Sequence, residues 1–192
     1  MATQIYYTPV ATVRWAHLIS AREQLDPAKP KAFSAELLFE NSNPLHSDFL
    51  AKLDEIFVET HGSKKRRSDK GQPWKPDKEN SALTVVKFKA LEFVRDDGTK
   101  AAGPRIIDAK KRSWNGQEIG NNSTCAIAFT AYGWERPEGV GLSLQPKTIQ
   151  VISFVPLTRE DGFDGFDMQE GYEVTPAGGF NDEFDEFAQG GL

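Results

Sequence analysis

Basic side chains interleaved with aromatic ones occupy the middle of this sequence. Residues 62–112 contain fifteen Lys or Arg against seven Asp or Glu, and Trp74, Phe88, Phe93 and Trp114 lie among them. Lys and Arg replace the counterions that condense on a polyanion. Flat rings stack on the bases of single-stranded nucleic acid, at about 1–3 kcal/mol per base, without reading the sequence. The pattern therefore favours a site for single-stranded nucleic acid.

The predicted contacts fall into two classes, cations for phosphates and aromatic rings for bases. The cations are Lys64, Lys65, Arg66, Arg67, Lys75, Lys87, Lys89, Arg105, Lys110, Lys111 and Arg112. The rings are Trp74, Trp114, Tyr132 and Trp134. The alternative for residues 64–67 is a solvated basic run or a localisation-like cluster. Trp15 and Phe88 are interpreted as core residues, because aromatic residues within strand patterns are usually buried.

Groups that catalyse reactions or bind metals are not clustered in the sequence. His17, His46 and His61 lie in different predicted elements, without the spacing of a metal site. Asp96 and Asp97 precede a glycine, which is typical of a solvated turn. Cys125 is the only cysteine and lies in an apolar run, so we expect a buried thiol. We predict no enzymatic activity, no cofactor and no metal.

The charge of the chain reverses near residue 160. Residues 160–192 hold ten acidic residues and no Lys or Arg, which leaves 18 acidic residues and all 23 basic ones in the preceding part. That preceding part is therefore +5 and the tail is −10, which together give the net charge of −5. We predict a domain over residues 1–159 and a disordered acidic-aromatic tail over residues 160–192.

A tethered polyanion near a basic groove competes with nucleic acid at high effective concentration. The tail also carries aromatic residues among its acids, which suit a basic, apolar pocket on a partner. The predicted partner-binding residues are Asp182, Glu183, Phe184, Asp185, Glu186 and Phe187. The alternative is a tail that only solubilises the chain.

The elements that must position these residues are mainly strands. Alternating and apolar runs predict strands over residues 8–20, 32–40, 83–94, 103–108, 123–134 and 142–157. One amphipathic helix is expected from a cap at Ser47 to about Glu59, ended by Gly62. Residues 62–80 and 109–116 are expected to be basic loops, the first of them mobile. The fold class is all-β with one helix, in a small barrel or sandwich.

The ends and hydropathy of the chain give no targeting signal. The N-terminal residues lack the pattern of a signal peptide, and no apolar run is long enough to span a membrane. We expect a soluble, cytoplasmic protein without membrane contact.

Several segments together resemble bacteriophage single-stranded DNA-binding proteins of the OB-fold type, in the podovirus-like replication class with an acidic C-terminal tail. They are Val86–Lys89 with Arg95–Gly98, Gly103–Asp108, Gly120–Thr124 with Phe129–Tyr132, Gly139–Leu144 with Ile149–Val151, and Asp182–Phe187. One feature departs from the class. Tails of this class often end on an aromatic residue, whereas this chain ends Gly-Gly-Leu192.

The resemblance implies a five-stranded antiparallel OB-like barrel with a helix between strands and a binding groove over one face. It implies a protein that coats single-stranded DNA in phage replication, recombination and repair. The tail would recruit replication proteins, such as the polymerase or the primase-helicase, and the resemblance allows a homodimer.

Two rival functions come from other classes. A virion or assembly β-barrel would use the acidic tail to dock a basic partner, would form stable oligomers and would not bind oligonucleotides. A nuclease or recombination enzyme would need a carboxylate cluster, which the basic part of the sequence lacks.

Overall fold

The computed structural model describes residues 4–64 and 71–157. Its elements are β1 (Tyr6–Tyr7), β2 (Ala11–Arg22), β3 (Ala32–Glu40), α1 (Pro44–His61), β4 (Trp74–Pro76), β5 (Leu83–Leu91), β6 (Arg105–Ile107), β7 (Thr124–Arg136) and β8 (Gly139–Ser153). The predicted all-β class with one helix is confirmed. In this part of the chain no helix has the length and apolarity needed to cross a membrane.

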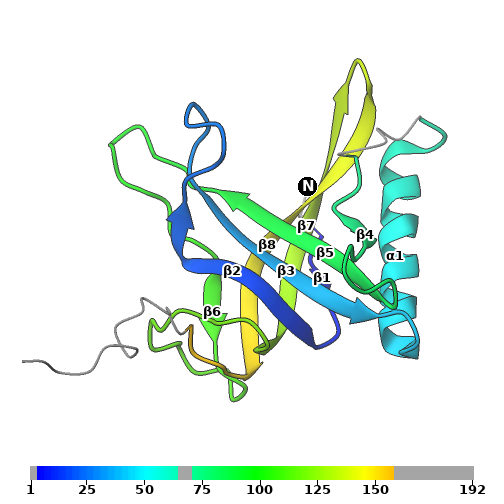
Figure 1. Ribbon diagram of the computed structural model, residues 1–192. Helices are drawn as coiled ribbons and strands as arrows, with labels where there is room; N and C mark the ends of the chain where they lie inside the picture. Colours follow the sequence, from blue (N-terminus) through cyan, green and yellow to red (C-terminus); the bar gives the residue numbers. More distant parts are fainter. Residues whose placement is uncertain (1–3, 65–70, 158–192) are drawn as a thin grey trace, which may run out of the picture. The chain divides into compact units, whose positions relative to one another are not determined.

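Five strands close into a barrel. β2 pairs with β3, β3 with β5, β5 with β8, β8 with β7, and β7 returns to β2. Figure 1 shows β2, β3 and β5 running side by side across one face. The predicted five-stranded barrel is confirmed, with one difference in its pairing. β5 and β8 are parallel, with Phe88 opposite Leu144, while the other four pairs are antiparallel.

The interior of the barrel is apolar and aromatic. Phe39, Phe88 and Phe129 are fully buried, and the rings of Phe88 and Phe129 meet edge to face at 5.3 Å. Burying such a side chain contributes about 1.5–3 kcal/mol. Cys125 is also fully buried, and burial raises the pKa of its thiol to about 12, so the thiol is held in its neutral form.

The helix begins earlier than predicted. Asn43 is its N-cap and accepts the backbone N–H of Leu45 at 3.0 Å, and Pro44 occupies the first turn. Ser47 lies inside the helix and its hydroxyl donates to the Asn41 carbonyl. Pro44 breaks the preceding strand and also starts the helix, because its fixed φ suits a first helical turn. Gly62 ends the helix at a φ of 59°, as predicted.

One buried histidine ties the helix to the barrel. His46 accepts the Glu40 backbone N–H at Nδ1, at 2.9 Å, and its Nε2 lies 3.0 Å from the Val10 carbonyl oxygen. Both ring nitrogens therefore have backbone partners. This arrangement supports the structural role that its isolated position in the sequence predicts.

The structure differs from the sequence-based expectation at one loop and at one turn. Within residues 62–80, Trp74–Pro76 form β4, which pairs with β5, and Trp74 is only 5% exposed. Gly139 and Gly141 lie between the strands predicted over 123–134 and 142–157 and suggest a turn there. The turn is instead formed by Pro137 and Glu138, because β8 already begins at Gly139. Pro146 lies in β8 opposite Phe129, beside an irregularity in the register with β7, so the strand continues past it.

Candidate nucleic-acid interface

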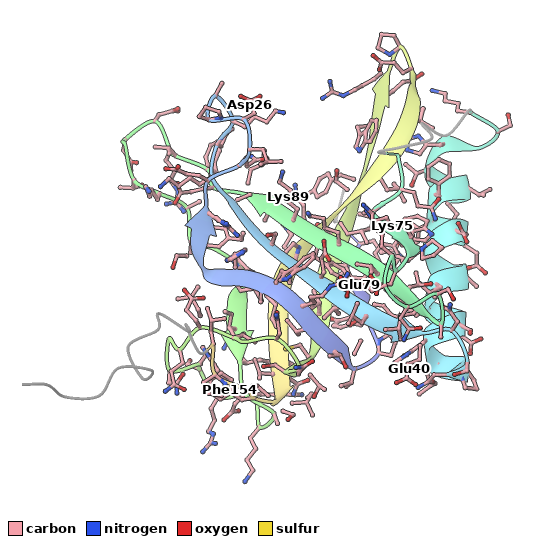
Figure 2. All side chains as sticks on the ribbon, in the orientation of Figure 1. Asp26, Glu40, Lys75, Glu79, Lys89 and Phe154 are labelled. Carbon is pink, nitrogen blue, oxygen red and sulfur yellow. The ribbon has the colours of Figure 1, made fainter. Side chains whose placement is uncertain are left out.

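A groove of about 770 Å³ lies over the outer face of β2, β3 and β5. The loop between β2 and β3, residues 23–31, contributes Leu25 and Lys29 to its lining. Figure 2 shows Asp26 on this loop and Lys89 on β5. The groove therefore combines a flat strand surface with a loop that rises at one end.

The floor of the groove consists of two rows of side chains that cross the three strands. The first row, in register from β2 to β5, is Arg14, Glu36 and Lys87, of which Glu36 and Lys87 line the groove and Arg14 lies beside it. The second row is His17, Ser34 and Lys89. Cationic or titratable groups thus lie on both outer strands, and the central strand presents oxygen atoms between them.

Trp15 projects from a bulge in β2. The register of β2 with β3 shifts between Arg14 and His17, and Trp15 has a φ of 51°, which is rare for a bulky residue. Its backbone N–H donates to the Asn121 side-chain oxygen at 2.8 Å instead of to a neighbouring strand. The indole remains 57% exposed and lines the groove. Backbone strain of this kind concentrates at functional sites, so the bulge supports a role for Trp15.

Arg14 packs against this indole and is itself held in place. Its guanidinium carbon lies 4.6 Å from the centre of the Trp15 ring. Its Nη2 donates to Asp77 at 2.8 Å and lies 3.4 Å from a carboxylate oxygen of Glu36. The hydrogen bond from Arg14 holds the pKa of Asp77 below its ordinary value of 3.8. A cation held over one part of the ring stiffens the aromatic platform.

Positive charge is concentrated on the β5 side of the groove. Burial lowers the pKa of Lys89, and the neighbouring cations Lys87 and Lys29 lower it further. The Lys89 ammonium donates to the Gln24 side-chain oxygen. Phosphates of a bound polyanion would offset the repulsion that Lys87 and Lys29 exert on the Lys89 ammonium.

His17 is the titratable group on the β2 side. Burial lowers its pKa most, Arg22 lowers it further, and Glu118 opposes the shift. Its Nε2 lies 3.1 Å from an Arg22 guanidinium nitrogen, which suits a neutral imidazole that accepts from the arginine. At neutral pH the cationic charge of this strand therefore comes from its arginines.

Three predicted contacts lie at or beside this groove. Lys87 and Lys89 line it, and exposed Lys75 lies on β4, opposite Val85 of the adjacent β5. Trp74, the neighbour of Lys75, is buried in the core. Its ring has no face for a base, which corrects the loop position predicted for it.

A second group of predicted contacts gathers at the β7–β8 hairpin. Tyr132 is 42% exposed, and Trp134 is half-buried on the same strand. Lys64 pairs with Glu135 at 2.6 Å, and the Leu142 N–H donates to the Gly71 carbonyl at 3.0 Å. Residues 64 and 71 both meet the hairpin, whereas Lys65, Arg66 and Arg67 lie outside the described residues.

The second predicted basic loop lies after β6 and outside the groove lining. Asp108 accepts the backbone N–H groups of Lys110 and Arg112, and its carboxylate pairs with the Arg112 side chain at 2.7 Å. Lys110, Lys111 and Arg112 are exposed, as is Arg105 on β6. Trp114 packs edge to face on Phe154 at 5.1 Å and donates its ring N–H to the Gln117 carbonyl. This loop therefore forms a separate basic surface, with Trp114 partly in the core.

The interpretation of Trp15 as a core residue is wrong, and sequence reasoning also missed Arg22 in the groove and Arg14 beside it. The signal was the imperfect alternation of the first strand. Val13, Ala16 and Leu18 are buried, so two outward residues follow each other where a regular strand has one. Such a break marks a bulge, and an aromatic residue at a bulge is a candidate contact. The predicted partner-binding residues 182–187 lie outside the described residues.

No protein-family model and no curated protein matches the sequence. Solved structures do match. One is gp2.5, a single-stranded DNA-binding protein encoded by bacteriophage T7, with a TM-score of 0.63 and 16% identity over 91% of this chain and 100% of that chain. The single-stranded DNA-binding protein from bacteriophage Enc34, in complex with single-stranded DNA, matches with a TM-score of 0.61 and 11% identity over 80% and 89% of the two chains. A C-terminal truncation of that protein gives a TM-score of 0.62 at 13% identity over 80% and 88%.

These matches show that the chain has the fold of phage single-stranded DNA-binding proteins over most of its length. The ring of five strands is similar to the OB-fold of gp2.5. The resemblance stated from the sequence is confirmed for the fold. In OB-folds the face of the second and third barrel strands is the usual surface for oligonucleotides, and those strands are β3 and β5 here.

Proposed function

We propose that this protein binds single-stranded DNA, largely independently of sequence, in the groove over β2, β3 and β5. The observation that carries the proposal is the exposed indole of Trp15, raised on a strained bulge between cationic side chains. The fold match adds support, because the two phage proteins that share it are single-stranded DNA-binding proteins. The protein acts by binding and protecting DNA, without catalysis.

Different residues of the groove contact the bases and the phosphates of the DNA. A base stacks on Trp15, which Arg14 holds in place, while Lys87, Lys89 and Arg22 contact phosphates. The bound DNA strand then continues past Lys75 to the β7–β8 hairpin. There Tyr132 and Trp134 provide further rings for stacking, and Lys64 provides a further cation. The exposed loop with Lys110, Lys111 and Arg112 is a second contact surface for longer strands.

The tail, residues 160–192, regulates this site in the same proposal. Its ten acidic residues compete with DNA for the basic surfaces, and a long strand displaces them. The displaced segment 182–187 then recruits partners of the phage replication machinery, such as a polymerase or a primase-helicase, in the host cytoplasm.

A titration of the whole chain with a thymidine oligonucleotide at several salt concentrations tests the function. We expect intrinsic Trp fluorescence to be quenched and the affinity to fall steeply between about 50 and 200 mM salt, as counterion release requires. An affinity that does not change with salt would contradict the phosphate contacts. Absence of any binding would exclude the function.

A further inference from the structure

The carboxylate of Glu36 lies on the central strand of the groove floor, whereas the other two carboxylates of the lining, Glu23 and Asp26, belong to the loop after β2. The register places Glu36 between Arg14 on β2 and Lys87 on β5. Its side chain is 15% exposed and lines the groove. A negative charge at this point repels phosphate, so a groove that held only the DNA backbone would bind better without it. A carboxylate at this position is better suited to a ligand group that donates hydrogen bonds.

The partners of Glu36 leave much of its acceptor capacity unused. Among the described residues these partners are Arg14, at 3.4 Å, and Lys87, at 3.8 Å. Charge-assisted N–H···O bonds in proteins are usually about 2.7–2.9 Å long. Arg14 makes its short bond to Asp77 instead, at 2.8 Å. Two oxygen atoms with up to four lone-pair directions are thus held at the groove floor by long contacts.

A base edge that carries an amino group complements this carboxylate. Cytosine presents its N4 amino group, and adenine its N6 amino group, and a Glu carboxylate accepts from such donors. Thymine presents the O4 acceptor in the same place, which a carboxylate repels. The cations on β2 and β5 attract the phosphates to the two sides of the groove floor. The bound DNA strand then lies with its bases over β3.

Given the proposed binding of single-stranded DNA, we propose that Glu36 reads base edges and gives the groove a preference for amino-bearing bases, cytosine above thymine among the pyrimidines. The preference is superimposed on binding that is otherwise independent of sequence. It acts at the position over Glu36, while Trp15 stacks on any neighbouring base.

The test compares the affinities of the whole chain for cytidine and thymidine oligonucleotides of equal length, at pH 8 and moderate salt. We expect wild-type protein to bind the cytidine strand about fivefold more tightly, the discrimination that one good contact to a base edge provides. In Glu36→Gln the amide both donates and accepts, so the ratio should fall below about twofold. Affinity for the thymidine strand should rise, because the repulsive charge is gone.

A probe and a matched variant separate this role from a structural one. A strand of pyrimidin-2-one nucleotides lacks only the 4-amino group of cytosine, and wild-type protein should bind it less tightly than the cytidine strand. This arm does not depend on the folding of a variant. Glu40→Gln removes an exposed carboxylate at the end of the same strand, outside the groove lining, and should keep the wild-type ratio.

The outcomes are distinct. Equal wild-type affinities for the cytidine, thymidine and pyrimidinone strands would overturn the role of Glu36 and leave DNA binding intact. A cytidine preference that persists unchanged in Glu36→Gln would assign the preference elsewhere and also overturn the proposal. Failure to bind any of the three strands would instead refute the proposed function itself.

Discussion

The position of Trp15 in the groove depends on a series of contacts with residues outside the groove. Asp77, which is nearly buried, fixes Arg14 at 2.8 Å, and Arg14 packs on Trp15. The Trp15 backbone is held by Asn121, 106 positions away in the sequence. A pattern along one strand cannot foresee a partner at that distance. The sequence therefore indicated an irregular strand but not the exposed indole.

Replacing Asp77 by Asn should destabilise the fold in a pH-dependent way. The hydrogen bond from Arg14 lowers the pKa of Asp77, so its stabilising contribution is complete above the ordinary value of 3.8 and is lost as pH falls through and below it. Urea unfolding should show a clear loss of stability in Asp77→Asn at pH 7. The gap to wild type should shrink below pH 3.8.

Glu79→Gln provides the matched control, since Glu79 is an exposed carboxylate two positions away. It should unfold like wild type at both ends of the pH range. A gap for Asp77→Asn that stays constant with pH would show that the ion pair does not account for the loss.

Elements with local signals were predictable, and those fixed by distant pairing were not. β3 was predicted at its observed bounds because residues 32–40 form a run rich in apolar residues, and the end of α1 was predicted from Gly62. β4 was missed because prolines and lysines surround Trp74, and only its pairing with β5 makes that segment a strand. The two Trp-bearing segments looked alike in the sequence, yet Trp74 lies in the core and residues 110–112 form an exposed basic surface.

The β7–β8 hairpin and the segment at Gly71 depend on a close approach of backbones. A Cβ atom added at Gly141 would lie 2.6 Å from the Gly71 Cα and 2.7 Å from its carbonyl oxygen. Gly141→Ala should therefore separate the two segments and lose the Leu142–Gly71 hydrogen bond. We expect a cost of about 1–3 kcal/mol in the free energy of unfolding, measured in urea.

Glu138→Ala, in the exposed turn of the same hairpin, is the control and should change stability little. A Gly141→Ala variant as stable as wild type would mean that the two segments can part without cost.

At the scale of the whole molecule, opposite charges are divided between two parts of the chain. The residues before 160 carry +5 and the tail −10. Residues 1–158 form one compact unit, so the part proposed to bind DNA can be studied without the tail. The proposed competition between tail and DNA is a property of this charge division and of the tether that joins the two parts.

Deleting residues 160–192 should raise the affinity for a short oligonucleotide at low salt, by an amount that fades as screening increases. A full-length variant with the ten tail carboxylates changed to amides should behave like the truncation, which separates charge from chain length. Equal affinities for wild type and both variants at every salt concentration would eliminate the competitor role.

The central claim is that DNA lies in the groove over β2, β3 and β5 with a base on Trp15. The most direct measurement is the affinity of Trp15→Ala for a short thymidine oligonucleotide. Tyr7→Ala is the control, because Tyr7 is an even more exposed aromatic that does not line the groove. We predict a loss of about 1–3 kcal/mol in binding free energy for Trp15→Ala and wild-type affinity for Tyr7→Ala. Undiminished binding by a folded Trp15→Ala protein would contradict the account.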